Sequence, residues 1–156
     1  MFRVHDFPIN AYVEAMAADY RRQGYKADFE PFAYNAEFLP VIAGASAPFT
    51  NATDQDSSFI CFYQQQSCYS NNDAGYVPFP NALVTITVDA TGRAMMDRPT
   101  HILNIFGRAG RPFPLIRPFV IGPKSSWTTV ATNADTFDMN LRLCFWGLKV
   151  YLDKLQ

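Results

Sequence analysis

From Tyr25 onward, the sequence is divided into short apolar or alternating runs that are separated by Pro, Gly, Asn and Asp. This punctuation is typical of β-strands joined by turns in a sandwich or a barrel. In the clearest run, 82–88, Ala, Val, Ile and Val alternate with Leu, Thr and Thr. A period of two is that of a strand with one face toward a core. With 156 residues, 49% of them hydrophobic, the chain is long enough for one domain with a substantial core.

The number of these runs predicts a mainly β protein with eight strands. The predicted strands are 29–34, 38–43, 58–64, 82–89, 101–106, 115–121, 126–132 and 139–152. Residues 44–56 and 65–75 are rich in polar side chains and are predicted as loops. We expect a turn at 89–92 and hairpin-like connections at 122–124 and 133–135, where Gly, Pro, Asn or Asp cluster.

One short helix is predicted near the N-terminus, over residues 11–23. Its apolar residues at helical spacing are Tyr12, Val13, Met16 and Tyr20. Asn10 is expected as the N-terminal cap, and Gly24 as the residue in the left-handed conformation that ends the helix. The chain is accordingly divided into an N-terminal arm with a helix, 1–26, and a β-sandwich domain, 27–156.

The last predicted strand contains a change of parity. Before Gly147 the apolar residues are Met139, Leu141, Leu143 and Phe145, and after it they are Leu148, Val150 and Leu152. A β-bulge at or beside Gly147 is predicted, because one extra residue would restore a single inward face.

The charges exclude some partners and leave another question open. The net charge of -1 and the pI near 6.0 argue against binding of nucleic acid through overall charge. No apolar run approaches the length of a membrane span, and the N-terminal residues lack the apolar core of a signal peptide, so we expect a soluble protein made without secretion. Residues 27–92 contain seven acidic residues and no Lys or Arg, whereas 93–156 are rich in basic residues. This division either orients the protein against a charged partner or is cancelled by interleaved strands.

The three cysteines, Cys61, Cys68 and Cys144, are interpreted as reduced packing residues. They are odd in number, show no CxxC spacing and lie in apolar or aromatic surroundings. Buried thiols of this kind pack as small hydrophobic groups.

Side chains for catalysis are few. His5 and His101 are the only histidines, and no local spacing supplies metal-ligand partners for them, as a cupin-like enzyme would need. The sequence has no Walker, GxSxG or HExxH motif. We therefore predict that the protein is not an enzyme and uses no metal or cofactor. His101 is interpreted as a structural residue at the start of an apolar strand.

Two segments leave a ligand site open. The turn 107–112 combines Gly with two Arg residues and is either an anion-binding cradle or an ordinary surface connection. Asp54 and Asp56 would form a calcium site only if their loop met the Asn, Asn and Asp of 71–73.

The C-terminal half contains a sequence of elements that carries a resemblance. A Pro-rich strand, 112–118, precedes the turn at Gly122 and Pro123, a Thr-rich strand that ends with Asn133, and the closing run 147–151. The segment that contains them resembles jelly-roll virion proteins of tailed bacteriophages, of the capsid decoration or cement type. The preceding strands are also similar, so the likeness covers about half of the chain and leaves out the helix.

The resemblance implies an eight-stranded antiparallel jelly-roll-like sandwich, preceded here by one short N-terminal helix. It implies a non-enzymatic structural component of a bacteriophage virion, assembled in the cytoplasm of the bacterial host. Its partners would be the major capsid protein or other virion proteins, and copies of itself, with no nucleic acid and no membrane. Repeated modest contacts would make attachment permanent.

Candidate contact residues are aromatic, amide and basic side chains of the expected arm, loops and turn. They are Phe2, Phe7 and Tyr12 near the N-terminus, Gln65, Gln66, Tyr69, Asn71 and Asn72 in the predicted polar loop, and the basic Arg108 and Arg111.

Two other functions stay open. A glycan-binding, lectin-like module of the same architecture would use Trp127 or Tyr69 as a stacking platform, although Trp127 also suits a core position because it alternates with Thr129. A structural protein of the phage neck or tail would share the same fold.

Overall fold

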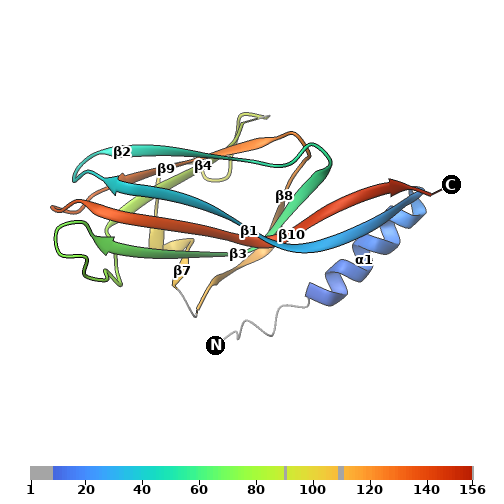
Figure 1. The fold of residues 1–156 in the computed structure, drawn as a ribbon, viewed down its shortest axis with the longest axis horizontal. Coiled ribbons are helices and arrows are strands. Elements are labelled where there is room, and N and C mark those ends of the chain that lie inside the picture. Colours follow the sequence, from blue (N-terminus) through green and yellow to red (C-terminus); the bar gives the residue numbers. More distant parts are fainter. Residues whose placement is uncertain (1–8, 90, 109–110, 156) are drawn as a thin grey trace.

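Two β-sheets face each other across an apolar core, and a helix lies against an extension of one of them (Figure 1). The computed structural model describes residues 9–89, 91–108 and 111–155. Within these residues the elements are α1 (Ile9–Arg22), β1 (Tyr25–Val41), β2 (Ser46–Ala52), β3 (Ser57–Ser70), β4 (Ala82–Val88), β5 (Arg93–Ala94), β6 (Thr100–His101), the 3₁₀ turn η2 (Ile102–Asn104), β7 (Gly107–Arg108), β8 (Phe113–Ile121), β9 (Ser126–Asn133) and β10 (Met139–Lys154). The mainly β fold with two sheets and one α-helix is as the sequence predicts.

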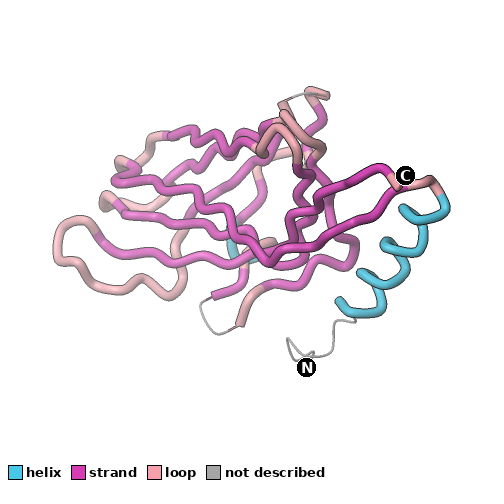
Figure 2. Tube along the Cα trace, turned by 45° about the vertical axis from the view of Figure 1, so that its right-hand side comes forward, coloured by secondary structure: helices cyan, strands magenta, loops and turns pink. Residues whose placement is uncertain are grey.

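The first sheet, sheet A, has the order β1-β10-β3, with β7 and β8 both paired to the far side of β3. The second sheet, sheet B, has the order β2-β9-β4, with β5 and β6 paired to β4. The described pairings are antiparallel except for the short parallel pair of β3 and β7. Figure 2 shows the two layers and the helix beside the end of sheet A.

The core between the sheets is centred on an indole. Trp127 on β9 is fully buried and lies parallel to the Phe59 ring of β3, with ring centroids 5.9 Å apart. Tyr34 and Phe145 meet the indole edge-on from β1 and β10. These side chains come from both sheets, so the alternation of each strand places its apolar residues in a common layer.

A second apolar cluster lies on the opposite face of sheet A. The ends of β1 and β10 extend beyond sheet B, and α1 lies along this extension (Figure 1). Here Ile60 and Phe62 of β3 and Val150 of β10 are buried against the half-buried face of the helix. The helix residues in this cluster are Ile9, Tyr12, Met16 and Tyr20. Sheet A therefore buries one face against sheet B and the other face against α1.

This change of buried face explains the parity change in β10. Phe145 faces the core between the sheets, whereas Leu148 and Val150 face α1. The predicted irregularity beside Gly147 is present, because the β10–β3 register shifts between Trp146 and Gly147. The extra residue is Phe62 of β3, however, and the β1–β10 ladder continues past Gly147 without a shift. The expectation that the bulge restores one inward face in β10 is therefore wrong.

The strand predictions differ from the structure where pleated backbone contains polar residues or proline. Predicted strands 29–34 and 38–43 form one long strand, β1, and the predicted loop 44–56 contains β2. β3 continues to Ser70 through the predicted loop 65–75, because pairing with β10 satisfies its backbone groups. The predicted strand 101–106 is wrong: after the two residues of β6, the backbone turns into η2, which buries Ile102.

The helix begins at Ile9 and ends at Arg22, close to the predicted bounds. Asn10 lies inside the helix and is not its cap. Gly24 has φ of +85°, the left-handed conformation expected where the helix ends. The predicted division at residue 26 falls just inside β1, which begins at Tyr25.

The turn at 89–92 joins strands of one sheet, and the Gly92 amide donates to the Asp89 carbonyl at 3.3 Å. The segments 122–124 and 133–135 are not hairpins, because each carries the chain from one sheet to the other. At the second crossing the buried Asn133 side chain donates to the carbonyls of Val41 and Phe137, at 3.0 Å and 2.9 Å. This amide replaces the ladder hydrogen bonds that end there.

A methyl group at Gly147 should disrupt the junction between the two clusters. Its Cβ would lie 1.8 Å from the Ile60 carbonyl oxygen, which is backbone and cannot move aside. We expect Gly147→Ala to lower the free energy of unfolding by about 1–3 kcal/mol or more, measured by chemical denaturation. Gly122→Ala is the matched control: its Cβ would meet nothing nearer than the Ser125 hydroxyl at 3.7 Å, and a change within about 0.5 kcal/mol is expected. Equal losses of stability in the two variants would contradict a close backbone contact at Gly147.

The helix should open independently of the sandwich. The Tyr12 ring meets Phe62 edge-on with centroids 5.5 Å apart, so Tyr12→Ala removes a main contact of α1. We expect hydrogen exchange at the α1 amides to become faster, because the free energy of local opening falls there by about 1–2 kcal/mol. The amides of β4 and β9 should keep their protection. Glu14→Ala, on the exposed face of the same helix, serves as the control. Loss of protection throughout the sandwich would show that the two clusters unfold together.

Candidate functional site

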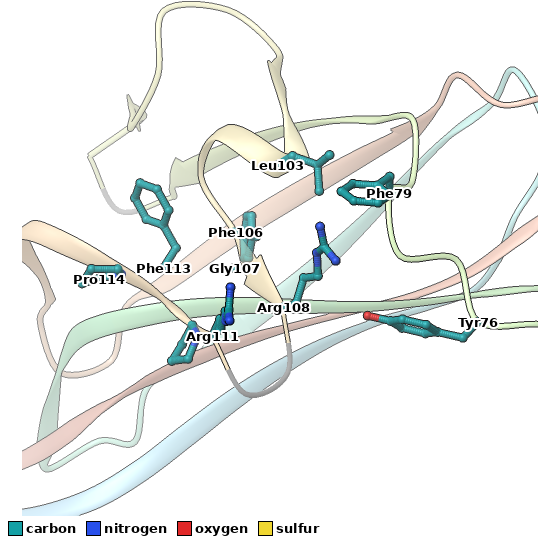
Figure 3. Close-up of a pocket in the computed structure, with 10 residues that line it drawn as sticks. Tyr76, Phe79, Leu103, Phe106, Gly107, Arg108, Arg111, Phe113 and Pro114 are labelled. Carbon is teal, nitrogen blue, oxygen red and sulfur yellow. The ribbon is translucent and has the colours of Figure 1, made fainter. Parts of the chain in front are cut away.

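An open pocket of about 700 Å³ lies beside the short strand β7 (Figure 3). Its walls are mainly aromatic and proline side chains, and two arginines supply its charge. The lining residues are Tyr76, Phe79, Leu103, Phe106, Gly107, Arg108, Arg111, Pro112, Phe113 and Pro114. We call this cavity the arginine pocket.

The backbone fixes the two arginines relative to each other. The Arg108 amide donates to the Arg111 carbonyl at 3.1 Å, and the Arg111 amide donates to the Arg108 carbonyl at 2.9 Å. A Cβ at Gly107 would lie 2.1 Å from the Arg111 carbonyl oxygen, so only glycine permits this close approach. β7 is in turn anchored to β3 by its parallel pairing with Gln65 and Gln66. The arginines thus stand on a segment that is tied to the centre of sheet A.

Arg108 is also held by its side chain. Its guanidinium carbon lies 4.0 Å from the centroid of the Phe79 ring, which is the geometry of a cation–π contact (Figure 3). Within the part of the chain that the structure describes, neither Arg108 nor Arg111 forms an ion pair with a carboxylate. Two arginines therefore line an open cavity, and the side chain of one of them, Arg108, is held in place.

Exposed aromatic side chains extend the pocket toward the end of β3. Tyr69 and Tyr76 form an edge-on pair with ring centroids 5.5 Å apart, and their backbones form an isolated bridge. Tyr69, Tyr76 and Phe79 are 41%, 47% and 62% exposed. We call these three residues the aromatic rim. Exposed tyrosine and phenylalanine beside arginine are the residue types enriched where proteins contact one another.

Some of the predicted contact residues come together at this site. Arg108 and Arg111 line the pocket, and Tyr69 belongs to the aromatic rim. Asn71 and Asn72 are exposed in the turn that follows β3, where Asn140 donates to the Asn71 side chain at 3.1 Å. The anion-cradle interpretation of 107–112 is compatible with this arrangement, although the lining is mostly apolar.

Other predicted contact residues lie elsewhere. Gln66 is 1% exposed and points between the sheets, because alternation along β3 turns every second residue inward, so it is not available to a partner. Gln65 faces outward on the same strand and is half-buried. Tyr12 packs on Phe62 within the molecule. Phe2 and Phe7 lie outside the described residues.

The aromatic residues that line the arginine pocket were not among the contact residues predicted from the sequence. Phe79 and Phe113 each stand in a Pro-Phe-Pro tripeptide, 78–80 and 112–114, and both side chains line the pocket. Proline on both sides restricts the backbone around the intervening residue. The repeated tripeptide was the available signal. Phe106 carries no such signal, because η2 places it.

The unequal distribution of charge along the chain is partly cancelled by interleaved strands. Arg142 of β10 pairs with Glu37 of β1 at 3.2 Å, and Lys149 of β10 pairs with Asp54 at 2.6 Å. Both pairs join the acidic middle of the sequence to its basic C-terminal part. Arg108 and Arg111 are the basic residues of that part which gather at a cavity.

The ion pair of Lys149 with Asp54 lies on the part of β10 that follows Gly147, toward the extension of sheet A beyond sheet B. The Lys149 side chain is nearly buried, and its Nζ lies 3.7 Å from the centroid of the Phe32 ring. Its hydrogen bond lowers the pKa of the Asp54 carboxyl. Burial is the largest single effect on Lys149 and lowers its pKa, but the hydrogen bond with Asp54 and the electrostatic interactions with Tyr34, Asp54 and Tyr151 together outweigh it, so the pKa is raised. We interpret this pair as structural.

Removal of the Asp54 carboxylate should therefore lower the stability of the fold more than removal of the Lys149 ammonium. We expect Asp54→Asn to destabilise the fold more than Lys149→Met, because the first leaves a nearly buried charge unpaired and the second keeps the stem packed on Phe32. Because the pKa of Asp54 is lower in the folded protein, the carboxylate stabilises the fold at pH values above the ordinary pKa of an aspartate. This stabilisation is lost as the pH falls through the pKa of Asp54 in the folded protein. Wild type should thus lose more stability than Asp54→Asn between about pH 5 and pH 3, measured by urea denaturation. Parallel pH profiles would contradict this.

The cysteines and His101 have structural surroundings. Cys61 and Cys68 are buried and Cys144 is half-buried, all as free thiols. Burial raises the pKa of Cys68 and of Cys144 to about 11, so both are thiols near neutral pH. The His101 Nδ1 accepts from the Leu103 amide at 3.3 Å and caps η2.

The condition for a calcium site is not met, because 54–56 and 71–73 lie at opposite ends of β3. No cluster of three His, Cys, Asp or Glu side chains that would suit a metal occurs among the residues described. Over the same residues, no helix has the length and apolar character needed to cross a membrane. Trp127 is 0% exposed, so it cannot serve as a stacking platform for a glycan.

Comparisons with known proteins give weak structural neighbours. No family model matches the sequence, and no curated protein matches it. The chain is similar to the VP2 subviral particle protein of infectious bursal disease virus, with a TM-score of 0.36 and 15% identity over 81% of this chain and 33% of that chain. It is also similar to the protein in the structure of the Gt strain of this virus, with a TM-score of 0.33 and 14% identity over 81% of this chain and 32% of that chain. A third similar structure is that of Drosophila NLP-core, which is described in terms of pentamer formation and histone binding. Its TM-score is 0.28, with 8% identity over 80% of this chain and 99% of that chain.

Viral capsid proteins are thus among the structural neighbours, and this chain spans about a third of their length. TM-scores this low do not define a shared fold.

Proposed function

We propose that this protein is a non-enzymatic structural component of a virion, and specifically a decoration or cement protein of a tailed-bacteriophage capsid. The observation that carries the proposal is the arginine pocket with its aromatic rim. Three described stretches of the chain, 76–79, 103–108 and 111–114, meet there, and the second contains β7, which pairs with β3 of sheet A. A rigid surface of exposed aromatic and arginine side chains suits attachment to another protein.

The strand order supports the jelly-roll assignment. If β1, β2, β3, β4, β6, β8, β9 and β10 are counted as strands one to eight, sheet A has the order one-eight-three-six and sheet B two-seven-four-five. This is the order of two Greek keys wound into a jelly roll. In this fold the chain crosses between sheets at their ends, which leaves loops there for attachment.

Attachment would be strengthened by repetition. A pocket of this size supplies one modest contact, but a symmetric particle presents the same contact many times, and copies of the protein that also touch one another bind together. The partners in this proposal are the major capsid protein or another virion protein and copies of the same chain, in a virion assembled in the host cytoplasm. A place in the neck or tail would use the same surface.

Reversal of the pocket charge should reduce attachment. We expect Arg108→Glu with Arg111→Glu to lower the occupancy of purified virions by about tenfold or more, since two favourable charges become repulsive. Virions from cells that express the tagged protein are purified by density gradient, and occupancy is measured by electron microscopy and quantitative blotting. Arg98→Glu is the matched control, because Arg98 is exposed, does not line the pocket and forms its one ion pair among the described residues with the exposed Asp97.

Light scattering of the free protein completes this test. A homo-oligomer, or a monomer that occupies virions, agrees with the proposal. A stable monomer that is absent from virions would overturn it. Full occupancy by the double variant would overturn the assignment of the arginine pocket as the attachment surface.

A further inference from the structure

We propose that the arginine pocket binds a carboxylate carried next to an apolar side chain, presented by a peptide segment of the protein to which this chain attaches. This inference rests on the proposed function and names the chemistry of its partner. Within the described residues the pocket is the cavity at which two arginines without carboxylate partners meet an apolar lining.

The first argument is charge with fixed geometry. A guanidinium donates two parallel hydrogen bonds to a carboxylate, and it loses little conformational freedom on binding if it is already held. Arg108 is held by the Phe79 ring at 4.0 Å, and its backbone is held through the reciprocal hydrogen bonds with Arg111. Arg111 is exposed and lines the same pocket, so both arginines border the cavity that a ligand would enter.

The second argument is the apolar wall. Phe106 is buried beneath the cavity, and Leu103, Pro112 and Phe113 are half-buried around it. Figure 3 shows Leu103, Phe106 and Phe113 near the segment that carries the two arginines. A volume of about 700 Å³ is within the range of small-ligand sites and accepts an aromatic or aliphatic side chain together with a carboxylate. An anion alone would leave this surface uncovered.

The third argument excludes other anions. Among the lining residues only Tyr76, Arg108 and Arg111 have polar side chains, so most hydroxyl groups of an acidic sugar would be buried without partners. Nucleic acid needs a track of basic residues along its phosphates, whereas this protein has a net charge of -1 and gathers two arginines here. A peptide carboxylate with an apolar neighbour satisfies both halves of the lining.

The probe for this test is 3-phenylpropionate, which joins one carboxylate to one apolar ring. Binding to the full chain is followed by NMR chemical-shift changes in the aromatic side chains of the pocket. For a ligand this small we expect Kd on the order of 1 mM. The uncharged 3-phenylpropanamide, which has the same shape, should bind about tenfold more weakly, and so should methyl glucuronoside, which has the charge without the apolar ring.

Single variants assign the charge to its residues. We expect Arg108→Gln and Arg111→Gln each to weaken binding of 3-phenylpropionate by about tenfold, while Arg98→Gln leaves it unchanged. Phe79→Leu should weaken it less, by removing the ring that holds Arg108. Unchanged melting temperatures show that each variant is folded.

Three results would overturn this inference: no shift changes with 3-phenylpropionate, equal binding of the amide, or tighter binding of the glucuronoside. The outcomes separate it from the proposed function. If virion occupancy depends on Arg108 and Arg111 but the probe does not bind, the partner chemistry is wrong and the attachment function stands. If the probe binds as expected and virions carry none of the protein, the pocket chemistry stands and the virion function is wrong.

Discussion

The close approach of two backbones at Gly147 is the constraint on which the rest of the fold depends. A Cβ there would overlap the Ile60 carbonyl, and the register of β10 against β3 shifts at this point. On one side of it sheet A packs against sheet B, and on the other side it packs against α1. One sheet can cover two apolar layers in this way only if its strands stay paired while the buried face changes. The glycine and the extra residue Phe62 make this possible.

The arginine pocket depends on the same kind of contact. Gly107 lets the Arg111 carbonyl approach the backbone of β7, and β7 is itself an addition to the edge of β3. The described part of the turn is therefore a short extension of the sheet and not a free loop. Attachment through it would cost less conformational entropy, because the backbone of both arginines and the side chain of Arg108 are already ordered in the folded protein.

Local patterns predicted much of the fold because alternation and turn residues act over a few residues. The strand around Val84 and the helix with its end at Gly24 follow from such patterns. The extent of β3 and the existence of β2 depend on partners far away in the sequence, which make strands of polar segments. For the same reason Gln66 is inside the sandwich although its neighbours indicate a surface loop.

The candidate site was predictable in its charge but not in its shape. Arg108 and Arg111 are close in sequence, so their turn is visible there, whereas Phe79 reaches them only because β3 and β4 lie in different sheets and the connection between them folds back along the end of β3. Sequence distance hides such a meeting. The two Pro-Phe-Pro tripeptides are the local trace of it, because a rigid backbone around an apolar ring is of use only where that ring has a defined place.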